Sequence, residues 1–380
     1  MTRRARLPLV LLLGAVLAGC SGYSGLGYYW QAAAGHVRLM RDARPVAEVM
    51  ADPATPAPLK QKLELTQRIR RYASDELGLP DNSSYTRYAD LHRPAALWNV
   101  VAAPTDSLTL KTWCFPVAGC VGYRGYYALA DAQQEATALR EQGLEVAVYP
   151  VPAYSTLGWL DWAGGDPLLS SFIGYPEGEL ARLIFHELAH QVVYVAGDTM
   201  FNESFATSVE RLGGSSWLRT HAGAQARETY AAFDAQRQQF RALALDTRRR
   251  LAAVYAQKAD TDEARASMTA NKLAVMADFR ERYAALRAGW AGPRQRAYDG
   301  WVERANNALF ATQAAYDELV PGFEALFEQE SRKTSAPWPA FFARVRQLAD
   351  LPKDERDRAL REAARGLSAP MQSASFDSAR

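Results

Sequence analysis

Two histidines and a glutamate near the middle of the chain have the types and the spacing of a metal-dependent hydrolytic site. They form the segment His186-Glu187-x-x-His190. On an α-helix, residues four apart lie one turn apart on the same face, so both imidazoles can reach one metal ion. Glu187 points about 100° away from His186 around the helix axis, which places its carboxylate beside the metal and not on it. There it can act as a general base on a metal-bound water.

The residues around these histidines predict a buried helix over 178–196. Its apolar positions are Leu180, Leu183, Ile184, Leu188 and Val193. The alternative is a buried helix whose two histidines only form hydrogen bonds, and this would require a separate partner for each ring. Zn²⁺ is the expected cofactor, because hydrolytic zinc sites take three protein ligands and keep one position open. A third ligand is therefore expected nearby.

The segment that follows offers two carboxylates as the third ligand. A helix is predicted over 202–212, ended by Gly213-Gly214. On this helix Glu203 and Glu210 lie two turns apart on the face opposite the apolar stripe. From the residues alone, either glutamate could complete a His-His-Glu site.

The pattern His186-Glu187-x-x-His190, followed by Asn202-Glu203-x-x-Ala206, resembles the gluzincin peptidases, the thermolysin-like and alanyl aminopeptidase-like group. In that group the Glu of an Asn-Glu pair on the next helix is the third zinc ligand. The resemblance therefore favours Glu203, although Glu210 lies nearer to the usual distance from the second histidine. Glu210 is then expected to accept the ring N–H of a ligating histidine.

More narrowly, the chain up to about residue 325 resembles a family of bacterial lipoproteins described as predicted aminopeptidases. The similar segments are the N-terminal Cys20 motif, 114–127, 154–159, the two zinc segments and 306–308. The resemblance implies a zinc metallopeptidase that hydrolyses peptides, with aminopeptidase action expected and endopeptidase action as the alternative. A non-catalytic envelope scaffold that keeps the metal fold is the alternative to an enzyme.

Gluzincins use a Tyr or His to stabilise the oxyanion, and the candidates here are Tyr154 and Tyr316, with Tyr194 and His221 as further ones. The Gly-x-Met-Glu-Asn element that captures the substrate N-terminus in alanyl aminopeptidases is absent. Asp161 and Asp166 precede the zinc helix and could replace it, an ordinary role in a turn being the alternative. A strand over 144–153 is predicted as an edge that aligns an extended peptide, an ordinary sheet edge being the alternative.

The first residues have the features of a secretory signal. Three arginines precede an apolar run over 7–17, which is too short for a permanent membrane span. The sequence Leu-Ala-Gly before Cys20 closely resembles the bacterial lipobox, in which the cysteine is lipidated and becomes the first mature residue. Ser21 in place of Asp points to the outer membrane. We therefore expect a lipid-anchored, periplasm-facing protein, with an ordinary cleaved signal as the alternative.

The two remaining cysteines suit an oxidising compartment. Cys114 and Cys120 enclose a Pro and a Gly, which favour a turn that brings the sulfurs together. A disulfide is expected, and two free thiols are the alternative. A zinc pair is disfavoured because no second Cys/His pair lies nearby.

Composition and patterning predict an α-rich α+β fold with a small mixed sheet. Hydrophobic residues are 48% and charged residues 23%, and Lys+Arg 44 against Asp+Glu 42 leaves a net charge of +2, which excludes the basic excess of a nucleic-acid binder. Helices are expected over 28–50, 57–78, 131–142, 222–258, 261–290, 295–330 and 338–365, and a strand over 97–102. The expected parts are a signal over 1–19, a tether over 20–27, a metallopeptidase core over 28–220, a long-helix lobe over 221–366 and a frayed tail over 367–380.

Overall fold

The chain folds into many helices around small sheets, and the expected α-rich α+β fold is confirmed. The computed structural model describes residues 25–115, 119–153, 156, 164–257, 259–292, 294–313 and 318–368. The helices are α2 (Gly25–Asp42), α3 (Val46–Ala51), α4 (Ala57–Asp75), α5 (Leu129–Glu141), α6 (Glu177–Ala189), α7 (Thr199–Thr220), α8 (Ala224–Tyr255), α9 (Asp262–Ala288), α10 (Asp299–Glu303), α11 (Asn307–Thr312), α12 (Val320–Ser331), α13 (Pro337–Ala349) and α14 (Lys353–Ser368).

The strands are short and belong to separate sheets. They are β1 (Arg44–Pro45), β2 (Arg87–Ala89), β3 (Leu97–Ala103), β4 (Trp113–Phe115), β5 (Gly119–Val121), β6 (Arg124–Tyr126), β7 (Glu145–Val151) and β8 (Leu168–Leu169). Among the described residues, the sheets have the orders β1-β2-β8, β6-β3-β7 and β4-β5. The β6-β3-β7 sheet is antiparallel, with Val100 of β3 opposite Val148 of β7.

Both faces of the β6-β3-β7 sheet are covered, which explains the continuous apolar run in β3. Side chains alternate along a strand, so Val100 and Ala102 face one side and Val101 and Ala103 face the other. The first pair packs against α5, in a cluster with Ala132 and Leu139. The second pair packs with residues of α11, Ala308 and Leu309.

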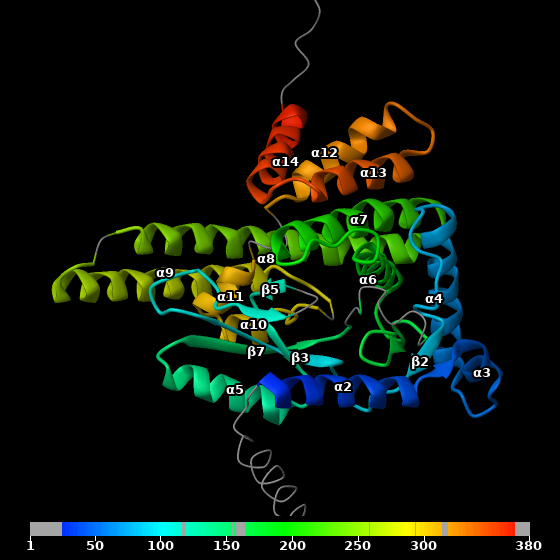
Figure 1. Ribbon diagram of the computed structural model, residues 1–380, viewed down its shortest axis with the longest axis horizontal. Helices are drawn as coiled ribbons and strands as arrows, with labels where there is room; N and C mark the ends of the chain where they lie inside the picture. Colours follow the sequence, from blue (N-terminus) through cyan, green and yellow to red (C-terminus); the bar gives the residue numbers. More distant parts are fainter. Residues whose placement is uncertain are drawn as a thin grey trace, which may run out of the picture.

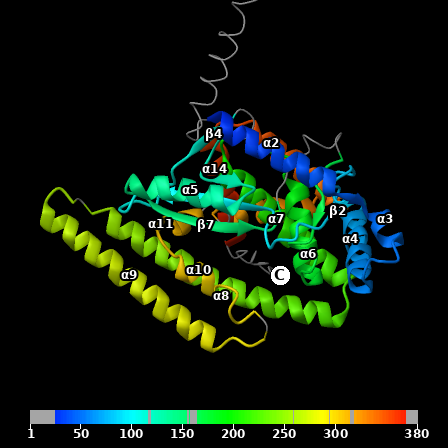
Figure 2. The same cartoon turned by 90° about the horizontal axis from the view of Figure 1, so that it is seen from below.

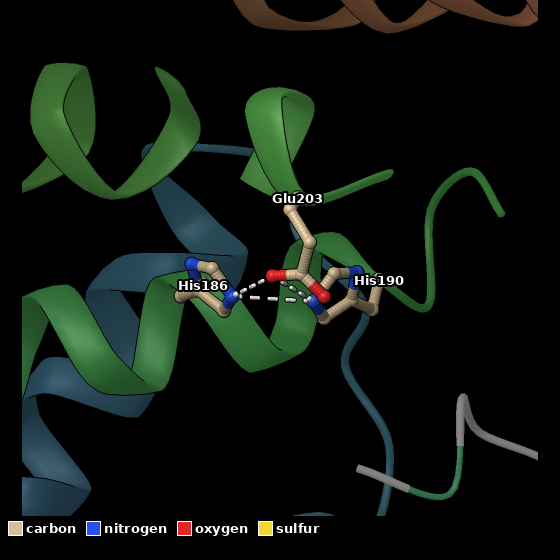
Figure 3. Close-up of side chains that lie close together, drawn as sticks. All are labelled: His186, His190 and Glu203. Atoms are coloured by element: carbon tan, nitrogen blue, oxygen red, sulfur yellow. Dashed lines mark hydrogen bonds and ion pairs between the residues drawn. The ribbon is translucent and has the colours of Figure 1, made fainter. Parts of the chain in front are cut away.

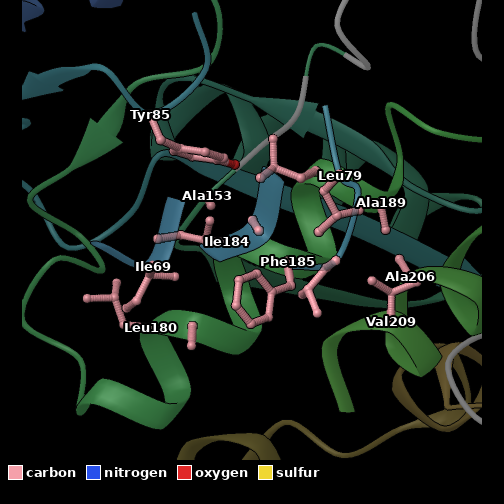
Figure 4. Close-up of a cluster of buried hydrophobic side chains, with 14 of the residues drawn as sticks. Ile69, Leu79, Tyr85, Ala153, Leu180, Ile184, Phe185, Ala189, Ala206 and Val209 are labelled. Atoms are coloured by element: carbon pink, nitrogen blue, oxygen red, sulfur yellow. The ribbon is translucent and has the colours of Figure 1, made fainter. Parts of the chain in front are cut away.

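The largest core surrounds α6 and α7, the helices that carry the candidate metal ligands. Figure 4 shows Ile184 and Phe185 of α6 next to Val209 of α7 and Ile69 of α4. On the other side of α7, α12, α13 and α14 form a layer that lies along one edge of the molecule in Figure 1. Here Phe205 contacts the rings of Phe323, Phe341 and Phe342. Aromatic packing therefore fixes α7 between two layers.

A long antiparallel pair, α8 and α9, forms a second core. Phe240 of α8 and Phe279 of α9 pack around Trp301 of α10. Figure 2 shows α8 and α9 running side by side along one side of the molecule, next to α10. The division of the chain into a core over 28–220 and a separate helical lobe over 221–366 stays a prediction. In the structure α8 to α11 share this core or the sheet, whereas α12 to α14 join the core around α7.

Several helix boundaries differ from the expectation for local reasons. α7 does not end at Gly213-Gly214 but continues to Thr220. A Cβ atom at Gly213 would approach the side chains of Leu77 and Phe185, so the glycine serves close packing and not a helix stop. The predicted segment 295–330 is divided into α10, α11 and α12, with the Asn306 side chain capping α11. Pro352 separates α13 from α14 in the segment 338–365.

The expected helix over 28–50 is also divided, because α2 ends at Asp42 and Arg44 and Pro45 pair with β2 before α3 begins. Within the described residues, no helix combines the length and the hydropathy that a bilayer-spanning segment needs.

Candidate metal centre

Two of the candidate ligands lie at the C-terminal end of α6. The helix begins directly after Pro176, with Glu177 and Glu179 in its first turn, where acidic side chains suit the positive end of the helix dipole. The helix ends at Ala189, earlier than the expected 196, and His190 caps it with helical backbone angles of φ −58° and ψ −22°. The two histidines therefore keep their one-turn spacing even though the helix is shorter.

The turn between α6 and α7 is held by the side chain of Asn202. Its Oδ1 accepts the N–H of Val195 at 2.8 Å and its Nδ2 donates to the carbonyl of Val195 at 2.8 Å. Asp198 caps α7 by accepting the N–H of Phe201 at 3.2 Å. These bonds set the rotation of α7, and Glu203 points from α7 toward both histidines (Figure 3).

Three ligand atoms meet at this point. The Nε2 atoms of His186 and His190 are 3.2 Å apart. Glu203 Oε2 lies 3.4 Å from Nε2 of His186 and 3.9 Å from Nε2 of His190. The other ring nitrogen of His190, Nδ1, is buried and has no hydrogen-bond partner among the described residues. His186, His190 and Glu203 thus form a group that can hold a metal ion.

The spacing of these atoms fits one shared cation. Metal–nitrogen bonds of about 2.0–2.1 Å at a tetrahedral angle place two ligand atoms about 3.3 Å apart. The separations of 3.2 and 3.4 Å match this value, and a small rotation of Glu203 would close the third separation of 3.9 Å. Two histidine nitrogens that face each other without a cation would need a proton between them.

Electrostatics around the ligands favour a positive charge at the same point. Burial by itself would lower the pKa of His186, but contacts with Glu203 and Glu210 raise that pKa well above its ordinary value. Burial would raise the pKa of Glu203, but the contact with His186 and the nearby His190 lower it. Burial lowers the pKa of His190 to about 4, which leaves a neutral imidazole. The site therefore attracts either a proton on His186 or a metal cation.

Glu210 contacts the far side of the His186 ring. Its Oε2 lies 3.1 Å from His186 Nδ1, and its Oε1 is paired with Arg182. Burial would raise the pKa of Glu210, but the charge of Arg182 and the contact with His186 lower it to about 2. A charged acceptor at Nδ1 keeps the proton on that nitrogen and leaves Nε2 directed at Glu203 and His190.

Glu187 lies beside the three candidate ligands and is not a member of that group. Burial raises the pKa of Glu187 to about 7, with the charge of His186 opposing and that of Glu203 adding to the rise. A carboxyl group with such a pKa can both accept and release a proton near neutral pH. His186 and Glu187 line two cavities, so their side chains are accessible from two sides.

A family model described as putative aminopeptidase matches residues 27–360. The chain belongs to this family. The match supports a peptidase function and covers all the helices and strands that build the metal centre except the first residues of α2. No curated protein matches the chain, and neither does any solved structure.

One of the two openings, here called the sheet-side cavity, lies between the candidate metal centre and the β6-β3-β7 sheet. Its walls are α2, the ends of these strands and the start of α7, and it contains His186, Glu187, His190 and Glu203. The second opening, the helix-side cavity, reaches His186 and Glu187 from α8 and α10 and is lined by Arg182, Glu210 and Arg237. Family membership and access from two sides together suit a peptide that passes the metal centre.

Of the other predicted site residues that the structure describes, Tyr194 lies near the candidate metal centre and His221 does not. Tyr154, Asp161, Tyr316 and Cys20 lie outside the described residues. The ring of Tyr194 is 6.5 Å from that of His190 and lines the sheet-side cavity. His221 stacks on Trp217 at 4.8 Å, at the end of α7, and lines a different depression.

Asp166 is buried and already engaged, because its carboxylate accepts the N–H of Thr156 at 3.0 Å and lies 3.4 Å from Gln191 Nε2. β7 is an edge strand as expected, but the Asn306 side chain bonds the Val146 carbonyl at 3.1 Å and covers part of that edge. The carboxylate of Asp166 is therefore already engaged, whereas the alignment of a peptide along β7 stays a prediction.

Cys114 and Cys120 are joined by a disulfide that closes the β4-β5 hairpin. The hairpin lies against the turn that follows His190, since a Cβ atom at Gly119 would meet the backbone of Ala196 and Gly197. Gly119 has a φ of +73°, which a glycine adopts without strain. The disulfide therefore closes a hairpin whose last residue, Val121, lines the sheet-side cavity.

Tyr123 is a site residue that sequence reasoning missed. It lies between β5 and β6 and lines the sheet-side cavity together with Glu203. Burial raises its pKa well above the ordinary value, and the charges of Glu203 and Glu187 add to the rise, so its hydroxyl stays protonated. The one available signal is its position three residues after Cys120, within the segment 114–127, but the chain has 18 tyrosines and no pattern separates this one.

Proposed function

We propose that this protein is a zinc-dependent peptidase whose metal is held by His186, His190 and Glu203. The observation that carries the proposal is the 3.2 Å separation of the two Nε2 atoms, with Glu203 Oε2 at 3.4 Å. Two imidazole nitrogens and one carboxylate suit zinc and leave a fourth position for substrate or water. Zinc in such a site polarises the scissile carbonyl and makes a bound water acidic enough to act at neutral pH.

The residues of the chain supply the proton transfers and the orientation. Glu187 takes the proton of the attacking water and passes it to the leaving amine, a double role that its pKa of about 7 supports. Glu210 keeps the His186 ring in the orientation that ligation requires. Tyr123 and Tyr194, two of the tyrosines on the sheet-side cavity, are candidates for donating a hydrogen bond to the developing oxyanion.

The proposed action is that of an aminopeptidase, in accordance with the family to which the chain belongs. Two kinds of substrate distinguish aminopeptidase from endopeptidase action: aminoacyl substrates and internally quenched peptides. Each is tested with a free and with an acetylated N-terminus. We expect the free N-terminus to be required. Equal cleavage of the acetylated peptide would assign an endopeptidase instead.

The proposed location is the periplasmic side of the bacterial outer membrane, with a lipid anchor on Cys20. The motif before this cysteine supports the proposal. Mass spectrometry of the protein expressed with its own leader tests it: we expect an N-terminal peptide that begins at Cys20 and carries acyl chains. An unmodified peptide, or one that begins elsewhere, would contradict the anchor without bearing on the peptidase activity.

The central experiment measures metal content and peptide hydrolysis for the wild type and for Glu187→Gln. We expect the variant to bind zinc normally and to lose at least about a hundredfold in kcat, because the general base is removed and the ligands are not. Glu303→Gln, at an exposed position of α10, is the matched control and should hydrolyse peptides like the wild type. If Glu187→Gln hydrolyses peptides at the wild-type rate, Glu187 is not the base, and if no form cleaves any peptide, a non-catalytic scaffold is favoured.

A further inference from the structure

Helix α2 exposes three large apolar side chains to the solvent. Trp30 is 77% exposed, Val37 65% and Tyr29 44%. They are three of the six large hydrophobic residues that are exposed in the part of the chain that the structure describes. Single apolar residues on a surface are ordinary, but several large ones on one short helix mark a contact surface.

Helical periodicity separates this face of α2 from the rest of the molecule. Trp30, Ala33 and Val37 follow one another at spacings of three and four residues, so they form one stripe, and all three are exposed. Arg38 and Arg41 are exposed at the C-terminal end of the stripe, and Nε of Arg41 lies 3.3 Å from the carboxylate of the exposed Asp42. We call these five residues the α2 outer face. It combines apolar bulk with positive charge.

The opposite stripe of α2 is attached to the protein. Gln31 donates to the carbonyl of Gly125 at 3.3 Å and accepts the N–H of Tyr127 at 3.2 Å. Gly35 faces the ring of Tyr127 so closely that a Cβ atom would clash, and Leu39 is buried in the main core. The α2 outer face is therefore not an inner surface that a local rearrangement would bury.

The position of α2 in the chain brings this face close to the proposed anchor. α2 begins at Gly25, and Cys20 precedes it by five residues. Five extended residues span at most about 17 Å, roughly half the thickness of a bilayer's hydrocarbon core. A lipidated Cys20 would therefore keep the first turns of α2 near the membrane surface.

We propose that the α2 outer face lies in the lipid–water interface of an anionic bilayer. Tryptophan side chains favour this depth of a membrane, and amphipathic helices lie there with the apolar face down. Arg38 and Arg41 suit the headgroups of anionic lipids. The proposal rests on the proposed function only for the anchor, because the exposed stripe is a property of the folded chain.

Membrane contact at α2 also orients the catalytic cleft. Tyr28, Ala32 and His36, on the inner side of the same helix, line the sheet-side cavity. α2 therefore lies between this cavity and the solvent, along one edge of the molecule (Figure 1). With its outer face on a bilayer, the enzyme would meet peptides that are presented at the membrane surface.

The test uses the folded chain begun at Ser21, so that no lipid anchor contributes, and vesicles of phosphatidylethanolamine and phosphatidylglycerol. Binding is measured by co-sedimentation for the wild type, for Trp30→Ser/Val37→Ser and for the control Leu273→Ser, a residue of α9 that is 63% exposed. We expect the double variant to bind about tenfold more weakly and the control to bind like the wild type. Added salt should weaken the binding of the wild type.

A second measurement places the helix in depth. Lipids brominated on their acyl chains should quench part of the tryptophan fluorescence of the wild type and less of that of Trp30→Phe. Equal vesicle binding by all variants, or a double variant that dissociates a dimer in solution without changing vesicle binding, would overturn the proposal. Trp30→Ser/Val37→Ser and Trp30→Phe should hydrolyse a soluble peptide at the wild-type rate, while Glu187→Gln should bind vesicles like the wild type. Failure of the membrane proposal can therefore be distinguished from failure of the peptidase proposal.

Discussion

At the residue scale, the metal centre is a balance between buried carboxylates and imidazoles. Glu203 and Glu210 contact opposite nitrogens of the His186 ring. Both carboxylates keep a lowered pKa despite burial, because each has a positively charged or hydrogen-bonding partner. This arrangement distinguishes their roles: Glu203 faces the point where the ring nitrogens converge, and Glu210 faces Arg182 and the outer side of the ring.

The two glutamates should respond differently to substitution. Glu203→Gln removes a ligand, so we expect the purified variant to contain almost no zinc and to be inactive. Glu210→Gln keeps the ligands and weakens the orientation of His186, which should reduce zinc affinity by about 10- to 100-fold. Titration with a competing chelator measures both affinities. The reverse order of effects would make Glu210 the ligand.

Zinc affinity should also depend on pH, and the pKa of His186 determines whether the affinity rises or falls as the pH increases. Because that pKa is raised well above its ordinary value in the metal-free chain, the ring is protonated at neutral pH and must release a proton when the metal binds. We expect affinity to rise about tenfold per pH unit up to the pKa of His186 and to level off above it. Isothermal titration in buffers of different ionisation enthalpy counts the released proton, and a pH-independent affinity would contradict this account.

At the scale of the elements, α7 is held in position at its N-terminus by charge. Asp198 caps the helix and is almost fully buried, and its Oδ2 accepts from Arg356 of α14 at 2.8 Å. Lys353 lies 3.2 Å from its other oxygen. Burial would raise the pKa of Asp198, but the bonds from Arg356 and from the Phe201 N–H lower it. The pair connects the helix that carries Glu203 to the last helix of the described chain.

Asp198→Asn should therefore destabilise the protein although asparagine can still cap α7. The substitution leaves the Arg356 guanidinium buried without its counter-ion, which costs about 3 kcal/mol of the free energy of unfolding. Urea unfolding measures the loss, and Asp354→Asn, at an exposed position of α14, should leave the midpoint unchanged. A cost equal to that of the control would mean that the ion pair does not stabilise the fold.

The same residue gives a pH dependence of stability. Since the folded-state pKa of Asp198 is lowered, its contribution is complete above the unfolded pKa of about 3.9 and is lost as the pH falls through the folded value. The difference in stability between the wild type and Asp198→Asn should therefore shrink in acid.

At the scale of the whole molecule, the α12-α13-α14 layer is what fixes α7 from the outside. α12 and α14 cross very closely, because a Cβ atom at Gly322 would meet the backbone of Leu360. Backbone atoms cannot move aside as a side chain does, so the crossing itself must open to admit a methyl group.

Gly322→Ala should cost about 1–3 kcal/mol in the free energy of unfolding, even though alanine favours a helix over glycine. Gly366→Ala, in α14 and with open space around it, is the matched control and should be neutral or stabilising. Thermal unfolding compares the two. A stabilising Gly322→Ala would show that the layer is looser than this crossing indicates.

The sequence by itself determined the features that depend on neighbouring residues, namely helices, strands and the spacing of side chains along them. The one-turn spacing of His186 and His190 and the long helices α8 and α9 follow from periodicity, and β3 follows from its run of strand-forming residues, so they could be predicted without the fold. The separate positions of Glu203 and Glu210 on one helical face were predictable for the same reason, but the choice between them needed a resemblance.

Tertiary structure decided everything that depends on which elements meet. Tyr123 is ordinary in the sequence and lines the same cavity as Glu203 only because the link between β5 and β6 lies beside the candidate metal centre. Gly213 is a residue type that often ends a helix, yet α7 continues through it. Its lack of a side chain leaves room for Leu77 and Phe185 to pack closely against the helix. Long-range contacts of this kind carry no periodic signal, since the partners are far apart in the chain and come together only when the core is formed.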